Sequence, residues 1–398
     1  MFDDEFFRDP YPLYDRLREQ CPVQRMDGGR FPFWLITGYA EAREALADPR
    51  LSKDTSAFEH VLAPDGRTRD IAPAIARSLL ATDPPDHTRL RRPVTRAFTP
   101  QLTDRLTPRI EQIAADLVAD LADRREADLV ADFAVPLPLT VICELLGVPP
   151  EDRPALRTWS QDLFLHGDHR HRDAASHHIA AYMTDLVTTR RTTRGDDLLS
   201  ALLNDQDEAP TMSPEELVSL ATLFVVAGHE TTANLIANTA LMLLTRPALM
   251  SDPHTTLEAL PQIIEEALRF DAPLGIATIR FTREPVTYAD TEIPADQAIM
   301  ISLAAANRDP RSFTSPHTFT PTPRPQPHLS FGHGPHYCPG ARLAKLETHI
   351  ALTTLLTTFP TLTLTQPPST LPWRQSRQMR SPQTLPTLLS AAPPPQPL

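Results

Sequence analysis

Residues 331–340 read FGHGPHYCPG and place Cys338 in a short segment rich in glycine and proline. A helical pattern follows over residues 341–357, so the sequence predicts a tight loop that presents Cys338 at a helix N-terminus. Unpaired backbone N–H groups and the positive end of the helix dipole favour a thiolate there. Such a thiolate serves as a metal ligand or a nucleophile, whereas most lone cysteines are buried structural residues. The loop glycines and the nearby His336 favour the functional interpretation.

A second candidate site lies inside a long apolar helix. The pattern Ser-Pro-Glu-Glu at residues 213–216 predicts a helix start with a capping box and proline at the first helical position. Apolar residues then recur at helical spacing as far as residues 246–247, and the only ionisable side chains between are His229 and Glu230. A helix that is apolar on all sides is buried, and a buried carboxylate costs several kcal/mol unless it is paired or protonated. Two interpretations of Glu230 follow: an ion pair with an arginine from another helix, or a functional acid.

The neighbours of Glu230 favour a functional role. Ala227 and Gly228 remove side-chain bulk from one helical turn, which lets a ligand approach the backbone. Thr231 places a hydroxyl group beside the acid. Threonine can also donate a hydrogen bond to the carbonyl four residues earlier, which would loosen the helix locally.

Two charged pairs lie on other predicted helices. Glu266 and Arg269 are three residues apart in an apolar run, a spacing that usually marks a surface salt bridge of little energetic value. His87 and Arg91 are four residues apart and follow Asp86, which can cap their helix. Two cations on one helical face suit an anionic ligand, but the arginines around them also fit a solvated basic face.

The composition limits the class of protein that contains these candidates. The formal net charge of −12 argues against a general nucleic-acid binder. The N-terminus lacks the basic start and apolar core of a signal peptide, which predicts a cytoplasmic protein with no membrane anchor. Three widely separated cysteines predict no disulfide framework. With no linker or repeat dividing it, the chain is expected to form a single domain over residues 1–398, with a loose Pro-rich tail at about 391–398.

Taken together, these segments resemble the cytochrome P450 family. The haem-binding pattern of the family is Phe-Gly-x-Gly-x-His/Arg-x-Cys-x-Gly, and each fixed position is filled here by Phe331, Gly332, Gly334, His336, Cys338 and Gly340. The stretch AGHETT at residues 227–232 is similar to the family's central-helix signature. The resemblance covers nearly the whole chain and implies a mostly helical α+β fold, with small β-sheets and a buried haem b.

The resemblance also implies roles for the candidate residues. Cys338 would be the axial thiolate ligand of the haem iron. Glu230 and Thr231 would be the acid and the alcohol that deliver protons during oxygen activation. Four cations would neutralise the two haem propionates: His87, Arg91, Arg280 and His336. Small or loop residues would contact the rest of the cofactor: Ala227, Gly228, Phe331, Gly332 and Gly340.

Other residues are implied to be structural or to contact partners. Glu266 and Arg269 would lock the core behind the haem together with Arg324. Electrons would come from NAD(P)H through a ferredoxin reductase and an acidic ferredoxin. The ferredoxin would dock on a basic patch on the cysteine side of the haem, formed by Arg89, Arg92, Arg96, Arg342 and Lys345.

The implied reaction is insertion of one oxygen atom from O2 into a C–H bond or across a double bond of an apolar organic substrate. Three alternatives remain: a peroxide-driven peroxygenase, a catalytically silent relative that acts as an allosteric partner, and a haem-based sensor. The Glu230–Thr231 pair argues against the first, because peroxide already carries the protons that the pair would deliver. Cys338 argues against the second, and the absence of turnover with any electron donor would mark the third.

The substrate class is expected by analogy to be a natural-product intermediate of a bacterial pathway. By resemblance, residues 55–81, 163–181 and 274–278 line the pocket together with the central helix, and the candidate contacts are Leu223, Val226, Leu274 and Ile276. The His-rich stretch 166–178 is too irregular in spacing for a typical zinc site and lies where a surface lid is expected. In the segment TEIPADQ, Thr291 and Asp296 stand where the family usually has glycines, which predicts a strained turn far from the chemistry.

Overall fold

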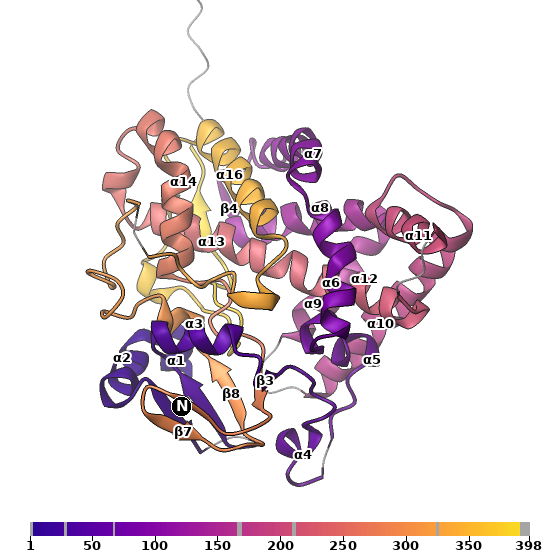
Figure 1. Ribbon diagram of the computed structural model, residues 1–398. Helices are drawn as coiled ribbons and strands as arrows, with labels where there is room; N and C mark the ends of the chain where they lie inside the picture. Colours follow the sequence, from indigo (N-terminus) through magenta and orange to yellow (C-terminus); the bar gives the residue numbers. More distant parts are fainter. Residues whose placement is uncertain are drawn as a thin grey trace, which may run out of the picture.

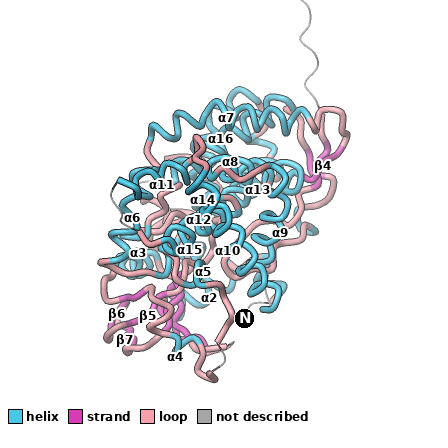
Figure 2. Tube along the Cα trace, turned by 90° about the vertical axis from the view of Figure 1, so that its right-hand side faces the viewer, coloured by secondary structure: helices cyan, strands magenta, loops and turns pink. Residues whose placement is uncertain are grey.

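The computed structural model describes residues 3–27, 30–66, 68–164, 169–208, 212–323 and 326–390. Helices form most of it, and the strands gather mainly toward one end (Figures 1 and 2). The helices before the middle of the chain are α1 (Asp4–Arg8), α2 (Tyr11–Gln20), α3 (Tyr39–Ala47), α4 (Glu59–Leu62), α5 (Pro73–Ala76), α6 (Asp86–Ala97), α7 (Pro100–Ala119), α8 (Pro136–Leu146), α9 (Arg153–Leu163) and α10 (His169–Thr192). The later helices are α11 (Leu198–Glu208), α12 (Pro214–Gly228), α13 (Glu230–Leu244), α14 (Pro253–Phe270), α15 (Leu303–Ala306) and α16 (Ala341–Thr358).

The main sheet brings strands from residues 23–52 together with strands from residues 280–301, in the order β1-β2-β8-β5-β3. Its strands are β1 (Val23–Met26), β2 (Phe33–Ile36), β3 (Leu51–Ser52), β5 (Arg280–Thr282) and β8 (Ala298–Ile301). Strands β2 and β8 pair in parallel, with Trp34 opposite Ile299, and the other pairs are antiparallel. Smaller sheets are formed by β4 (Glu126–Asp128), β10 (Pro386–Leu388) and β9 (Thr363–Leu364), and by the hairpin of β6 (Val286–Tyr288) and β7 (Thr291–Ile293). The predicted mostly helical α+β fold is confirmed.

The central helix begins as the sequence predicts. The Ser213 hydroxyl accepts a hydrogen bond from the Glu216 N–H at 3.2 Å, and the Glu216 carboxylate accepts one from the Ser213 N–H at 2.8 Å. The predicted single helix is nevertheless divided, because α12 ends at Gly228 and α13 begins at Glu230. The Thr231 hydroxyl donates to the Ala227 carbonyl at 3.0 Å, which is the local loosening expected of threonine.

Helix α13 lies in the middle of the molecule (Figure 1). It packs into a core that also includes apolar residues of α7, α14 and α16. The range Pro214–Leu244 is long and apolar enough to cross a membrane by length and composition alone, but 72% of its most apolar window is buried inside the protein. This degree of burial is typical of a core helix.

In the segment TEIPADQ, which was expected to be strained at Thr291 and Asp296, only Asp296 has a left-handed backbone. Thr291 lies within β7 as ordinary extended backbone, so the strain expected there is absent. Asp296 has a φ of 58°, and the turn residues Ala289 and Asp290 have φ of 47° and 61°. Aspartate tolerates this left-handed region better than alanine does, so Ala289 is the more strained of the two turn residues.

Helix α16 contains a buried acid, Glu347, whose carboxyl group has no hydrogen-bond partner at Oε2 among the described residues. Burial raises the pKa of Glu347 from 4.5 to about 8. Between these two pH values the folded protein binds the extra proton, so this residue makes stability fall as pH rises. We therefore expect Glu347→Gln to raise the free energy of unfolding at about pH 8 by on the order of 3 kcal/mol, and to change it little at about pH 5.

Denaturant unfolding of both proteins at the two pH values measures this difference. Glu111→Gln, which changes an exposed glutamate of α7, is the matched control and should have little effect at either pH. Equal effects of Glu347→Gln at both pH values would contradict a protonated, buried Glu347.

Candidate functional site

Cys338 lies between a turn of 3-10 helix, Gly334–His336, and the N-terminus of α16. The Cys338 N–H donates to the Phe331 carbonyl at 2.9 Å, which closes the loop. Gly332 and Gly334 have φ of 76° and 73°, a region that favours glycine. A Cβ atom on Gly334 would lie 2.9 Å from the Cα of Ala47 in α3, so this position also requires a glycine for space.

The helix N-terminus does not by itself produce a thiolate. Burial raises the pKa of the Cys338 thiol, and the opposing effects of the Gly340 N–H and the Arg91 guanidinium are smaller. The predicted preference of the loop for a thiolate is therefore not met by these two groups alone, because desolvation outweighs them. A metal cation at the sulfur would reverse this balance, since coordinated thiols are deprotonated.

Basic side chains from four separate segments gather beside the cysteine loop. They include the predicted His87 and Arg91 of α6, Arg280 of β5 and His336, together with Lys53, which directly follows β3. The rings of His87 and His336 lie 4.2 Å apart between centroids. Arg91 donates to the Tyr337 carbonyl, which ties α6 to the loop. Asp86 does not cap α6, because Pro85 occupies the cap position.

This basic cluster fits a buried dianion. Burial lowers the pKa of His336, and the charges of Lys53, His87, Arg280 and Arg91 add to this effect, so that the pKa is about 2. The pKa of Lys53 lies well below its usual value, mainly because Lys53 is buried and also because the positive charge of Arg280 is near. The buried Nε2 atom of His87 has no hydrogen-bond partner among the described residues. Asp83 is the carboxylate that acts on this cluster, and a haem with two propionates would add further negative charge and an acceptor for His87 Nε2.

The predicted acid, Glu230, is fully buried at the break in the central helix. The guanidinium of Arg374 donates to Glu230 Oε2 and, at 3.2 Å, to the amide oxygen of Asn234. His229 Nε2 lies 3.5 Å from Glu230 Oε1. Burial alone would raise the pKa of Glu230, but these two basic neighbours hold it at about 2. Glu230 is therefore an ionised carboxylate, and its arginine comes from a loop and not from another helix.

Small residues open the helix face beside this acid. Ala227 is exposed and Gly228 is half-buried, although α12 and α13 are otherwise largely buried. A Cβ atom on Gly228 would lie 3.2 Å from the Ile142 side chain of α8, so larger residues are disfavoured there. The predicted substrate contacts Leu223 and Val226 are half-buried on α12.

The other two predicted substrate contacts lie on the segment before β5. Leu274 is half-buried and pairs with Met379, whereas Ile276 is buried and pairs with Ser302. The pairing with Met379 places this segment beside the loop that carries Arg374.

The predicted structural pair forms a bidentate ion pair. Arg269 donates to both carboxylate oxygens of Glu266, at 2.7 and 2.8 Å, and both residues are buried. Arg269 also donates to the carbonyls of Asn307 and Pro316, at 3.0 and 2.9 Å. These bonds connect α14 to the segment that leads to the cysteine loop. Arg324, the predicted third member, lies outside the described residues.

The predicted basic patch is smaller than expected. Arg89 binds Glu216 at 2.6 Å, and Lys345 binds Glu265 at 2.8 Å. Arg342 lies 3.3 Å from Asp104. These carboxylates offset three of the five expected charges. Arg92 and Arg96 are exposed on α6, and within the described ranges neither forms an ion pair.

Two residues of the site, Lys53 and Arg374, were not predicted from the sequence. Lys53 lies in no recognisable motif, and only the sheet brings it to Arg280. Arg374 belongs to the stretch RQSRQMR, whose arginines recur at every third position. That regular spacing was a signal of a charged loop, but it does not identify the partner of the arginine.

Comparisons with known proteins agree on one family. The family model described as cytochrome P450 matches residues 153–386. The chain is 43% identical to cytochrome P450 107B1 of Saccharopolyspora erythraea, covering 97% of this chain and 96% of the relative. It is 40% identical to the cytochrome P450 monooxygenase PikC of Streptomyces venezuelae, covering 96% and 91%. The solved structure of the tirandamycin C-bound P450 monooxygenase TamI superposes with a TM-score of 0.92 at 40% identity, covering 98% of this chain and 99% of that one.

Proposed function

The chain belongs to the cytochrome P450 family and is a monooxygenase, and from this premise we propose that Cys338 ligates the iron of haem b while Glu230 and Thr231 form its proton relay. The observation that carries the proposal is the convergence of the cysteine loop and the unbalanced basic cluster. His87, Arg91, Arg280 and His336, together with the newly found Lys53, would hold the propionates. When bound, the haem supplies the oxygen-activating chemistry that no protein side chain provides.

The protein residues would control protons and water around the cofactor. Glu230 is ionised, so it would act first as a proton acceptor and then pass the proton toward the Thr231 hydroxyl. Opening of the Arg374 ion pair would let Glu230 take up a proton, because burial then raises its pKa. The apolar faces of Leu223 and Val226 would exclude water from the substrate side.

We infer that the substrate is an intermediate or product of natural-product biosynthesis. The polyketide biosynthesis cytochrome P450 PksS of Bacillus subtilis and the mycinamicin IV hydroxylase/epoxidase of Micromonospora griseorubida, relatives at 35% and 38% identity, support this class. Three of the predicted substrate contacts, Leu223, Val226 and Leu274, are apolar and half-buried, which supports an organic substrate with a large apolar part. The protein would act in the cytoplasm.

The wild-type protein tests this proposal directly. Purified enzyme should contain haem, and its ferrous carbonyl complex should show the strongly red-shifted main band of a thiolate ligand. With NADPH, a ferredoxin reductase and a ferredoxin, it should consume O2 and incorporate one of its oxygen atoms into product. Turnover with peroxide but not with this electron chain would instead support the peroxygenase alternative.

We expect the ferredoxin to dock beside α6 and the cysteine loop, where Arg92 and Arg96 are exposed. Arg96→Glu should lower the rate constant for reduction by an acidic ferredoxin by about tenfold at low salt, because steering depends on charge. The wild-type rate should itself fall as salt rises. Stopped-flow reduction at several ionic strengths measures both effects.

Arg191→Glu is the matched control, because it makes the same charge change on an exposed residue of α10. Its reduction rate should stay close to that of the wild type. Equal rates for the Arg96→Glu variant and the wild type at low salt would exclude α6 as the docking surface.

A further inference from the structure

Two segments that are far apart in sequence meet at the beginning of α10. The N–H of Ala72, just before α5, donates to the Ser176 hydroxyl at 3.0 Å. Arg69 forms an ion pair with Asp173. Figure 1 shows α5 beside α10, in agreement with these contacts. Both segments belong to the ranges expected to line the substrate pocket.

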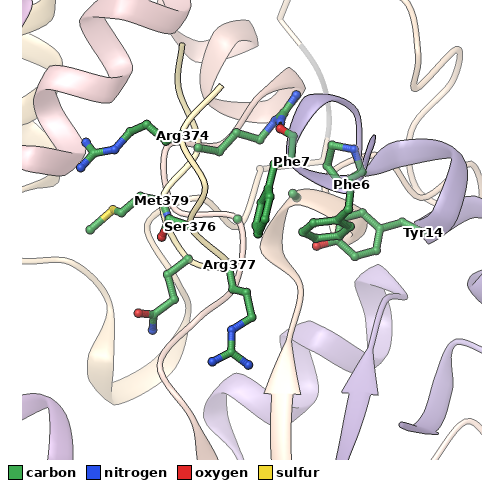
Figure 3. Close-up of a pocket in the computed structure, with 12 residues that line it drawn as sticks. Phe6, Phe7, Tyr14, Arg374, Ser376, Arg377 and Met379 are labelled. Atoms are coloured by element: carbon green, nitrogen blue, oxygen red, sulfur yellow. The ribbon is translucent and has the colours of Figure 1, made fainter. Parts of the chain in front are cut away.

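The loop of residues 374–380 approaches the same place from the C-terminal part of the chain. It carries Arg374, the partner of the buried acid, and Arg377, which lines a hollow beside Phe7 (Figure 3). The Gln378 carbonyl accepts a hydrogen bond from the Gly275 N–H at 2.7 Å. The loop therefore borders a third segment of the expected substrate pocket.

Positive charge exceeds negative charge where these segments meet. Burial lowers the pKa of Arg172, and the charges of Arg69 and Arg377 add to this effect, so that the pKa is about 10. Asp173 is the carboxylate that acts in the opposite direction. Burial, Arg69 and Arg172 also lower the pKa of His169. The positive end of the α10 dipole adds to the same imbalance.

Among the described residues, Arg69 and Arg172 each have guanidinium N–H groups without a hydrogen-bond acceptor. Arg172 uses its Nε to donate to the Leu163 carbonyl at 2.9 Å, and within the described ranges its terminal amino groups have no acceptor. The Nε of Arg69 is buried and has no hydrogen-bond partner among the described residues. Planar guanidinium groups match the two oxygens of a carboxylate, which can accept two parallel hydrogen bonds.

We propose that Arg69, Arg172 and Arg377 form a cationic cluster that binds the carboxylate of an otherwise apolar substrate at the edge of the substrate site. This proposal rests on the proposed function, because it defines the substrate class of the same site. Arg377 lies three residues after Arg374, so their Cα atoms are at most about 11 Å apart. A carboxylate held here would leave the apolar part of the molecule near Glu230 and Thr231, and oxidation would occur away from the acid group.

Binding of two matched probes to the purified holoenzyme tests the proposal. Dodecanoic acid and its methyl ester share one apolar chain, and only the acid carries a charge. Calorimetry and the spin-state change of the haem both report their dissociation constants. The wild type should bind the acid about tenfold or more tightly than the ester, and rising salt should reduce this preference.

Single substitutions then test which arginines produce the preference for the acid over the ester. Arg172→Gln and Arg377→Gln should each weaken binding of the acid about tenfold and leave binding of the ester unchanged. Arg191→Gln, at the other end of α10, should change neither. Arg172→Lys should prefer the acid over the ester more strongly than Arg172→Gln does, but less strongly than the wild type, because lysine retains the charge but not the planar guanidinium group.

Several outcomes would overturn the proposal. A wild-type protein that binds the acid no more tightly than the ester, or does not bind it, has no carboxylate site. Equal losses for both probes in the Arg172→Gln and Arg377→Gln variants would indicate a general disturbance of the pocket. A wild-type protein without the thiolate-type haem spectrum would refute the proposed function instead, so the two failures are distinguishable.

Discussion

Replacing Cys338 with histidine should abolish monooxygenation and move the main band of the ferrous carbonyl complex to the position typical of a histidine-ligated haem. The physical reason is the axial ligand, because a thiolate pushes electron density toward the iron and favours O–O cleavage, whereas imidazole does so far less. The absorption spectrum and the oxygen-dependent product yield measure the two effects separately.

Cys21→Ser is the matched control for this substitution. Cys21 is half-buried near the start of β1, and its sulfur donates to the Val23 carbonyl at 3.1 Å. This variant should retain both the wild-type spectrum and the wild-type product yield. An unchanged carbonyl spectrum in the Cys338→His protein would remove Cys338 from the iron.

Glu230→Gln should slow product formation by about 10²–10⁴-fold, the usual contribution of a positioned acid–base group. Glutamine keeps the size of the side chain and can still accept a hydrogen bond from Arg374, but it cannot accept and release a proton. Thr231→Ala should leave haem content and substrate binding nearly intact and divert electrons into hydrogen peroxide. Added peroxide should partly rescue both variants, because it brings its own protons. The ratio of product to NADPH consumed is the measurement.

The pH dependence gives a separate test of the Arg374 ion pair. In the wild type the pKa of Glu230 is about 2, so the carboxylate stays ionised throughout the working range. Arg374→Gln removes a group that lowers this pKa, while burial continues to raise it. The acidic limb of the pH–rate profile should therefore move to higher pH in this variant.

Other results would contradict the relay. If Glu230→Gln and Thr231→Ala both form product at the wild-type rate and stoichiometry, the pair is only a structural break in the central helix. If Arg374→Gln leaves the pH profile unchanged, Glu230 does not titrate during turnover. Neither result would affect the assignment of Cys338.

Several features could be predicted from the sequence because short-range interactions produce them. The capping box at Ser213 involves residues only three positions apart, and the structure contains both of its hydrogen bonds. The glycine-rich loop and the start of α16 are equally local, and α16 extends one residue beyond the predicted end. The bidentate contact of Glu266 with Arg269 follows from their spacing on one helical face.

The protonation states and the charge partners of the buried groups could not be predicted from the sequence, because they depend on the tertiary structure. Arg374 is 144 residues from Glu230, and Arg172 is near Arg69 and Arg377 only because the fold brings their three segments together. The pattern around Cys338 suggested a lowered pKa, whereas burial raises it, because a sequence does not show how strongly a group is desolvated. Local patterns specify where helices and loops begin and end. The charge on a buried side chain depends on burial and on groups brought from distant segments, and only the packed fold determines both.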